Sequence, residues 1–163
     1  MKEIISNKGR IALVDDDDYE RLNGYKWYNS TDGYIQRSIK KSNEKWMIWM
    51  IHWDVIGKPI DGQQVDHRDG NKLNNCRSNL RICSNAENGM NRGMNKNNST
   101  GYKGVKWNNA SNKWIALIRT NGKQMYLGSF NDKIDAALAY NDGAKKYHGE
   151  FAQLNNVERK LKE

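Results

Sequence analysis

The feature that most limits how this chain can fold is a set of polar residues between two short strand-like runs near its middle. Asp66 and His67 end the first run, and a loop rich in Asn, Asp and Gly follows them. The second run leads into Ser84, with Glu87 three positions later. This spacing matches a capping box, in which the two side chains satisfy exposed N–H groups at the start of a helix. The pattern predicts strand, loop, strand and helix, with Asn88 in the first helical turn and facing back towards Asp66 and His67.

In this order, Asp66-His67, Asn79-Leu80-Arg81 and Asn88 resemble the HNH nucleases, in the variant whose third motif residue is Asn. The resemblance implies a ββα-metal unit in which Asp66 and Asn88 hold one divalent ion. Mg²⁺ or Mn²⁺ is expected, because both favour oxygen ligands. It further implies that His67 is the general base, for which a pKa near neutral is suitable. Asn79 is expected to hold the loop and to help orient the ring of His67.

Taken singly, each of these residues has an ordinary alternative as a turn former or a surface side chain. Their joint order favours the nuclease. Three further residues near the motif are candidates for contacts with the DNA backbone: His52, Arg68 and Arg81. For His52, a half-buried structural histidine is an equal alternative.

The C-terminal third predicts a three-stranded sheet followed by a helix. The expected strands are residues 102–107, 113–119 and 124–130. Asn121-Gly122 between the last two favours a type I′ turn, because both residues tolerate positive φ. Asn131 is expected to cap a helix that runs to about residue 148.

This segment resembles an AP2 DNA-binding domain, with Tyr-Lys-Gly-Val at 102–105, Leu-Gly-Ser-Phe at 127–130 and Ala-Ala-x-Ala-Tyr at 136–140. In that family the exposed sheet face enters the major groove. The resemblance gives four candidate contacts: Lys103, Lys106, Trp114 and Arg119. Core packing is the alternative for Trp114. Lys stands at two positions where the family has Arg, so the family's base preference does not transfer.

The charge and the cysteine content limit the kinds of partner and metal that we expect this protein to bind. The net charge is +8 with an isoelectric point near 9.4, and residues 97–163 carry +5 of it. Such a balance favours a polyanionic partner. Cys76 and Cys83 form no Cys-x-x-Cys motif, so we expect no structural zinc. No apolar run approaches the roughly 20 residues that cross a bilayer, and we expect a cytoplasmic protein without a membrane partner.

The chain as a whole predicts an α+β fold. We expect a small β-rich N-terminal segment (1–50), an HNH ββα-metal unit (51–92), a linker (93–100) and an AP2-like three-stranded antiparallel sheet packed on one helix (101–157). Within the first segment, strands are expected at 25–28 and 34–39, and the acidic run 15–18 is expected to be a solvated helix cap.

These features favour a metal-dependent endonuclease of the homing type, acting on double-stranded DNA without an organic cofactor. A monomer with one site would nick, whereas a dimer could break both strands. The combination of motifs suggests a phage or mobile-element origin in a bacterial host. The alternatives are a non-catalytic sequence-specific DNA-binding regulator and a non-specific or structure-selective HNH nuclease. RNA binding is disfavoured, because the narrow groove of A-form RNA excludes such a sheet.

Overall fold

The computed structural model describes residues 1–158, which fold into two compact units. The first unit ends at Asn88 and the second begins at Gly89. The predicted α+β class is confirmed, because short antiparallel sheets and helices alternate along the chain. The finer division into four segments stays a prediction. In the part of the chain that is described, no helix is both long and apolar enough to span a membrane.

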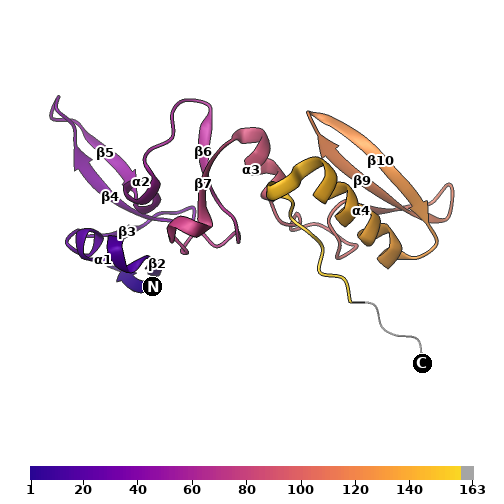
Figure 1. Ribbon diagram of the computed structural model, residues 1–163, viewed down its shortest axis with the longest axis horizontal. Coiled ribbons are helices and arrows are strands. Elements are labelled where there is room, and N and C mark those ends of the chain that lie inside the picture. Colours follow the sequence, from indigo (N-terminus) through magenta and orange to yellow (C-terminus); the bar gives the residue numbers. More distant parts are fainter. Residues whose placement is uncertain (159–163) are drawn as a thin grey trace. The chain divides into compact units, whose positions relative to one another are not determined.

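The first unit contains two antiparallel hairpins, a three-stranded antiparallel sheet and short helices (Figure 1). Strands β1 and β2 pair with each other, as do β6 and β7, and the order of the larger sheet is β3-β4-β5. In chain order the elements are β1 (Lys2–Ile5), β2 (Ile11–Val14), α1 (Asp16–Asn23), β3 (Tyr28–Asn29), β4 (Ile35–Lys40), β5 (Trp46–Met50), α2 (Ile51–Ile56), β6 (Gln63–His67), the 3-10 helix η1 (Arg77–Asn79), β7 (Leu80–Ser84) and α3 (Asn85–Asn91). The boundary between the two units falls within α3.

One hydrophobic core joins the N-terminal sheets to the β6–β7 hairpin. It is formed by Ile4, Ala12, Val14, Leu22, Trp27, Ile35, Ile51, Val55, Val65 and Leu80. Trp27 is buried there and donates its indole N–H to the carbonyl of Leu22 at 2.8 Å. The prediction of a strand over residues 25–28 is therefore wrong for most of that segment, and pairing begins only at Tyr28. Because the core is shared, the hairpin with Asp66 and His67 rests on the N-terminal sheets.

The acidic run at the start of α1 differs from the prediction. Asp15 is the N-cap residue, and its Oδ2 accepts the backbone N–H of Arg77 at 2.7 Å. Asp18 is buried and accepts hydrogen bonds from Arg21 and Arg77 at 2.6 and 2.7 Å. Burial by itself would raise the pKa of Asp18, but the two guanidinium groups hold that pKa below its usual value. The expectation of a solvated cap is thus wrong at Asp18, which ties α1 to the segment before β7.

The second unit has the predicted three-stranded sheet with one helix against it (Figure 1). Its elements are β8 (Val105–Asn108), β9 (Lys113–Thr120), β10 (Lys123–Phe130), α4 (Lys133–His148) and the 3-10 helix η2 (Gly149–Phe151). Asn121 and Gly122 both have positive φ, of 50° and 74°, as a type I′ turn requires. The predicted helix cap is wrong by one residue, because Asp132 and not Asn131 accepts the N–H of Ile134, at 2.6 Å.

Close contact between α4 and the sheet depends on small residues. Ala136, Ala137 and Ala144 on α4 are fully buried. Gly104, just before β8, has a φ of 74°, and a Cβ at this position would lie 2.0 Å from the ring of Tyr140. The unit therefore packs its helix tightly on one sheet face and leaves the opposite face exposed.

Candidate active site

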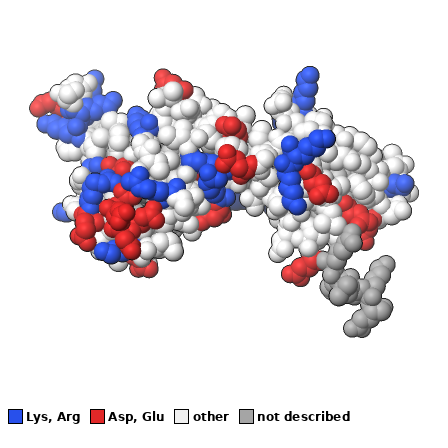
Figure 2. Space-filling view, in the orientation of Figure 1, with Lys and Arg blue, Asp and Glu red and all other residues white. Residues whose placement is uncertain are grey.

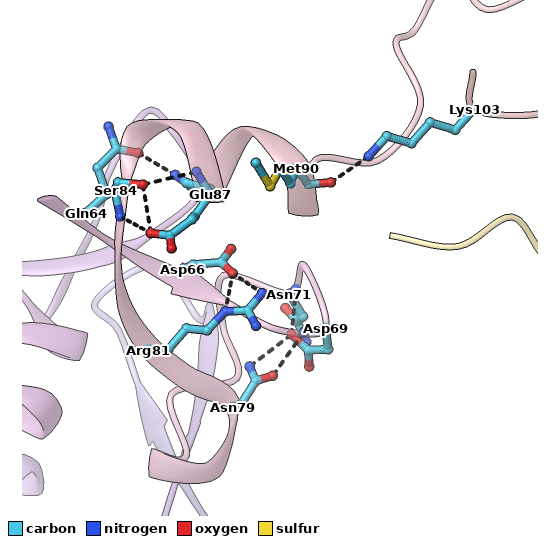
Figure 3. Close-up of polar contacts among 11 residues, drawn as sticks. Gln64, Asp66, Asp69, Asn71, Asn79, Arg81, Ser84, Glu87, Met90 and Lys103 are labelled. Atoms are coloured by element: carbon cyan, nitrogen blue, oxygen red, sulfur yellow. Dashed lines mark hydrogen bonds and ion pairs between the residues drawn. The ribbon is translucent and has the colours of Figure 1, made fainter. Parts of the chain in front are cut away.

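A buried ion pair lies in the β6–β7 hairpin. Asp66 and Arg81 are direct partners across the two strands. The Nε and Nη2 atoms of Arg81 lie 2.8 and 2.7 Å from Oδ2 of Asp66 (Figure 3). The two side chains are only 7% and 6% exposed, so each charge helps to compensate the other where little water can reach. Arg81, a predicted DNA contact, thus has its guanidinium against the predicted metal ligand.

His67, the next residue, is buried among aromatic rings. Its ring centroid lies 5.9 Å from that of Tyr34 and 5.4 Å from that of His52. Its Nε2 atom lies 3.3 Å from Oδ1 of Asn75, whose own side chain is buried and bonded to a loop carbonyl. An amide oxygen can only accept, so this contact puts the proton on Nε2 and leaves Nδ1 as the basic nitrogen.

Burial favours the neutral form of both neighbouring histidines. Burial lowers the pKa of His67 below its ordinary value, although the contact with Asn75 and the nearby charge of Asp69 oppose the shift. Burial also lowers the pKa of His52 to about 3. The Nδ1 atom of His52 has no hydrogen-bond partner among the described residues. His52 therefore supports the ring of His67 from inside the unit, and its predicted contact with DNA stays a prediction.

Asn79 ties together the loop that separates the two strands. Its Nδ2 donates to the carbonyl of Asn74 at 2.8 Å and to Oδ1 of Asp69 at 2.9 Å. Its Oδ1 accepts the backbone N–H of Asp69 at 3.0 Å. Asp69 also accepts from the Asn74 amide at 2.8 Å, and these bonds hold the pKa of Asp69 down against its burial. The loop after His67 is therefore fixed at both ends by side chains.

Asn88 lies in the first turns of α3 and contacts β6. The predicted capping box is confirmed: the N–H of Ser84 donates to Oε2 of Glu87 at 2.8 Å, and the N–H of Glu87 donates to Oγ of Ser84 at 3.2 Å. The side-chain nitrogen of Asn88 donates to Oε1 of Gln64. Gln64 and Asp66 are two residues apart on a strand, so they share one face of the hairpin. Figure 3 shows Gln64 beside the capping pair and Asp66 close by.

The available ligands fit a hard divalent cation held by few protein atoms. Asp66 offers a carboxylate, and Asn88 keeps its amide oxygen as an acceptor because it donates through nitrogen. Across residues 1–158, no group of three or more His, Cys, Asp and Glu side chains could hold a metal ion. Mg²⁺ suits such a sparse oxygen site, because it retains several of its waters. Any cation that binds Asp66 must share its carboxylate with Arg81.

In the second unit, strand alternation divides the predicted DNA contacts between two faces. Ala116 and Ile118 of β9 pack towards α4, and Trp114 follows the same alternation and packs against that cluster. Lys106 and Arg119 belong to the opposite face and are exposed. The geometry therefore favours Lys106 and Arg119 over Trp114 as groups that can meet a ligand.

Lys103 has its ammonium engaged within the second unit. Its Nζ donates to the carbonyl of Met90 at 2.7 Å (Figure 3) and to that of Arg92 at 2.5 Å. Burial lowers the pKa of Lys103 to about 8. A contact between Lys103 and DNA, as predicted, would require these two hydrogen bonds to be replaced. Arg68 is exposed in the loop that follows His67, and its predicted contact with DNA stays a prediction.

Two residues of this region were not predicted as part of the site. Gln64 could have been found, because it precedes Asp66 by two positions and so points to the same face. Tyr34 gives no such signal, since it reaches His67 from a segment more than 30 residues earlier in the chain.

Residues 55–90 match the family model described as HNH endonuclease. The chain is 32% identical over 152 residues to the uncharacterized HNH endonuclease L560 of Acanthamoeba polyphaga mimivirus, covering 93% of this chain and 78% of that protein. The chain belongs to the HNH endonuclease family. Protein 3.8 of Escherichia phage T7 is 32% identical over 103 residues, covering 63% of this chain and 84% of that protein.

This HNH endonuclease also has a partial similarity to plant AP2 proteins. Dehydration-responsive element-binding protein 2D of Arabidopsis thaliana is 43% identical over 61 residues, which are 36% of this chain and 29% of that protein. The β8–β10 sheet packed on α4 is the AP2-like part of the fold. No solved structure matches the chain.

Proposed function

We propose that this protein is a homing-type DNA endonuclease in which Asp66, His67, Asn79 and Asn88 form the catalytic centre. The observation that carries the proposal is the β6–β7–α3 arrangement: a neutral, oriented imidazole at His67, next to a carboxylate, with Asn88 bonded to the same strand. A phosphodiester has charged oxygens and a poor leaving group, so its hydrolysis needs both a base and charge stabilisation.

In the proposed reaction, His67 takes a proton from the attacking water through Nδ1. A bond forms between the water oxygen and phosphorus, and the bond from phosphorus to the 3′ oxygen breaks. Asn75 holds the ring of His67 throughout, and Asn79 holds the loop that follows it. Asp66 and Asn88 would bind Mg²⁺ or Mn²⁺, and the ion would stabilise the negative charge that develops on the phosphate and on the departing oxygen.

A test of this centre is the relaxation of supercoiled plasmid in Mg²⁺ and in EDTA. We expect relaxation that depends on Mg²⁺ and that yields mainly nicked circles, as one active site per monomer should. Asn88→Ala should need at least about tenfold more Mg²⁺ for the same rate, because one ligand is lost. Asn85→Ala is the matched control, since Asn85 is an exposed residue of the same helix. Cleavage that persists in EDTA would exclude the proposed centre.

We further propose that the exposed face of the AP2-like sheet anchors the enzyme on double-stranded DNA. Lys106 and Arg119 supply positive charge on the face opposite α4. Replacing both by alanine should weaken DNA binding and reduce the slope of log affinity against log salt by about two, as expected for two lost phosphate contacts. The comparison is Lys145→Ala with Lys146→Ala on α4, which removes the same charge from the helix side. If both double variants lose the same affinity for DNA, binding depends only on the total charge of the protein and not on this sheet face.

The proposed setting is a phage or mobile genetic element in a bacterial cytoplasm. Two of the relatives come from a phage and from a giant virus. A monomer on DNA that nicks one strand suits a chain with one such centre, and a double-strand break would need a second copy or a second event.

A further inference from the structure

An open groove on the β3-β4-β5 sheet has no part in the catalytic centre described above. Its volume is about 450 Å³, within the range of small-ligand sites. It is lined by Tyr25, Lys26, Tyr28, Arg37, Ser38 and Trp46. Aromatic rings and basic groups together are the combination that binds nucleotides, through stacking and through phosphate contacts.

The register of the sheet puts exposed apolar side chains on one face. Tyr28 pairs with Gln36, Ile48 with Ser38, and Trp46 with Lys40. The side chains of residues 36, 38 and 40 lie on the same side of β4, so the side chains of their partners lie on that side of the sheet as well. Trp46 is 69% exposed, Ile48 47% and Tyr28 43%. None of these three packs against the hydrophobic core that the described residues form. Exposed apolar surface with a polar rim commonly marks a binding site.

The groove is preformed by Arg37. Its guanidinium lies 3.8 Å from the ring centroid of Tyr25 and bonds both carboxylate oxygens of Asp54, at 3.1 and 3.2 Å. Asp54 belongs to α2, so these bonds fix one side of the groove to the helix that also carries His52. The charge of Arg37 is matched by that of Asp54, so Lys26 is the groove residue that can attract an anion.

Acidic and basic side chains lie in different parts of the first unit, and the basic ones are concentrated on the segment that forms the β3-β4-β5 sheet. Residues 25–50 hold five Lys and Arg against two Asp and Glu, whereas residues 1–24 hold four against six. Figure 2 shows acidic side chains gathered over α1 and basic ones at the end of the β4–β5 hairpin. A polyanion is therefore attracted to the sheet with the groove and repelled by α1.

We propose that this groove binds one unstacked nucleotide of the DNA substrate, with Trp46 and Tyr28 stacked on its base. The inference rests on the proposed function, because it takes DNA as the substrate. The groove and the catalytic loop share one scaffold: β5 runs directly into α2, and His52 of α2 lies against His67. Stacking accepts any base, so the groove adds affinity for the DNA without sequence preference.

The first test is binding of a 200-base-pair linear duplex in EDTA, where no cleavage occurs, by the full chain. Trp46→Ala should weaken binding about fivefold or more, the effect of one lost base–aromatic contact. Trp46→Phe should restore most of it. Ile60→Ala is the control, because Ile60 is an equally exposed apolar residue outside the groove. Since Trp46 is exposed, the unfolding temperature should not change. Unchanged affinity in a folded Trp46→Ala protein would overturn the proposal, even if the enzyme cuts DNA as proposed.

The second test locates the contact. With the nick mapped on a plasmid, 2-aminopurine is placed at each position within six nucleotides of it, and fluorescence is followed on binding by the His67→Ala protein. A change at one position that disappears when Trp46→Ala is added supports the groove. Equal signals with and without Trp46→Ala would overturn it. Sedimentation can show whether the protein self-associates. If Trp46→Ala abolishes self-association and leaves the affinity for DNA unchanged, this face binds a second copy of the chain, and the proposal is overturned.

Discussion

Replacing His67 by alanine should lower the rate of DNA cleavage by about 10²- to 10⁴-fold, the usual contribution of a general base. The ring is buried, neutral and held at Nε2 by Asn75, so no neighbouring side chain can take over its position. His52 lies closest among the other histidines, but its pKa of about 3 and its burial make it a poor substitute. The rate is best measured as a single turnover on plasmid with saturating protein, so that binding does not enter.

The control for this substitution is His148→Gln. His148 is also a buried histidine, but it belongs to the second unit and bonds the carbonyl of Arg119 at 2.9 Å. It should leave the saturated rate within about threefold of the wild type. The His67→Ala protein must keep its unfolding temperature and its affinity for DNA in EDTA. If it is folded, binds DNA and still cuts at a near-normal rate, the base is a different group.

Local signals in the sequence were sufficient for most of the elements that build the site. The capping box at Ser84 and Glu87, the strand ending at His67 and the turn at Asn121-Gly122 each depend on residues a few positions apart. Their geometry follows from backbone rules that operate over such distances. The resemblance to known families then supplied the order of the units and the candidate roles.

Contacts between distant segments could not be predicted in this way. The bond of Arg81 to Asp66 depends on the register of two strands separated by a long loop, and the burial of Asp18 depends on where Arg77 arrives. The contacts of Lys103 could not be predicted either. Its ammonium donates to backbone carbonyls, and no local sequence pattern indicates that these carbonyls lie near it. In each case a charged residue predicted to face solvent or DNA is used inside the protein.

Replacing Arg81 by methionine should destabilise the metal-free protein by about 3–5 kcal/mol, because it removes the guanidinium that lies against the buried carboxylate of Asp66. Both side chains are almost fully buried, so solvent cannot compensate for the loss. The free energy of unfolding can be measured with guanidinium in EDTA. Lys8→Met is the control in the same unit, at an exposed side chain whose replacement should change stability by no more than about 0.5 kcal/mol.

The same substitution separates two roles of Arg81, as a structural partner of Asp66 and as a competitor of the metal. If Asp66 is a ligand, Mn²⁺ should stabilise the Arg81→Met protein more than the wild type, since the ion no longer shares the carboxylate with a guanidinium. Adding Asp66→Leu to Arg81→Met should recover most of the lost stability, because an apolar pair of similar size replaces the ion pair. That double variant should gain nothing from Mn²⁺ and should not cut DNA. A gain from Mn²⁺ that survives without the carboxylate would place the metal elsewhere in the protein.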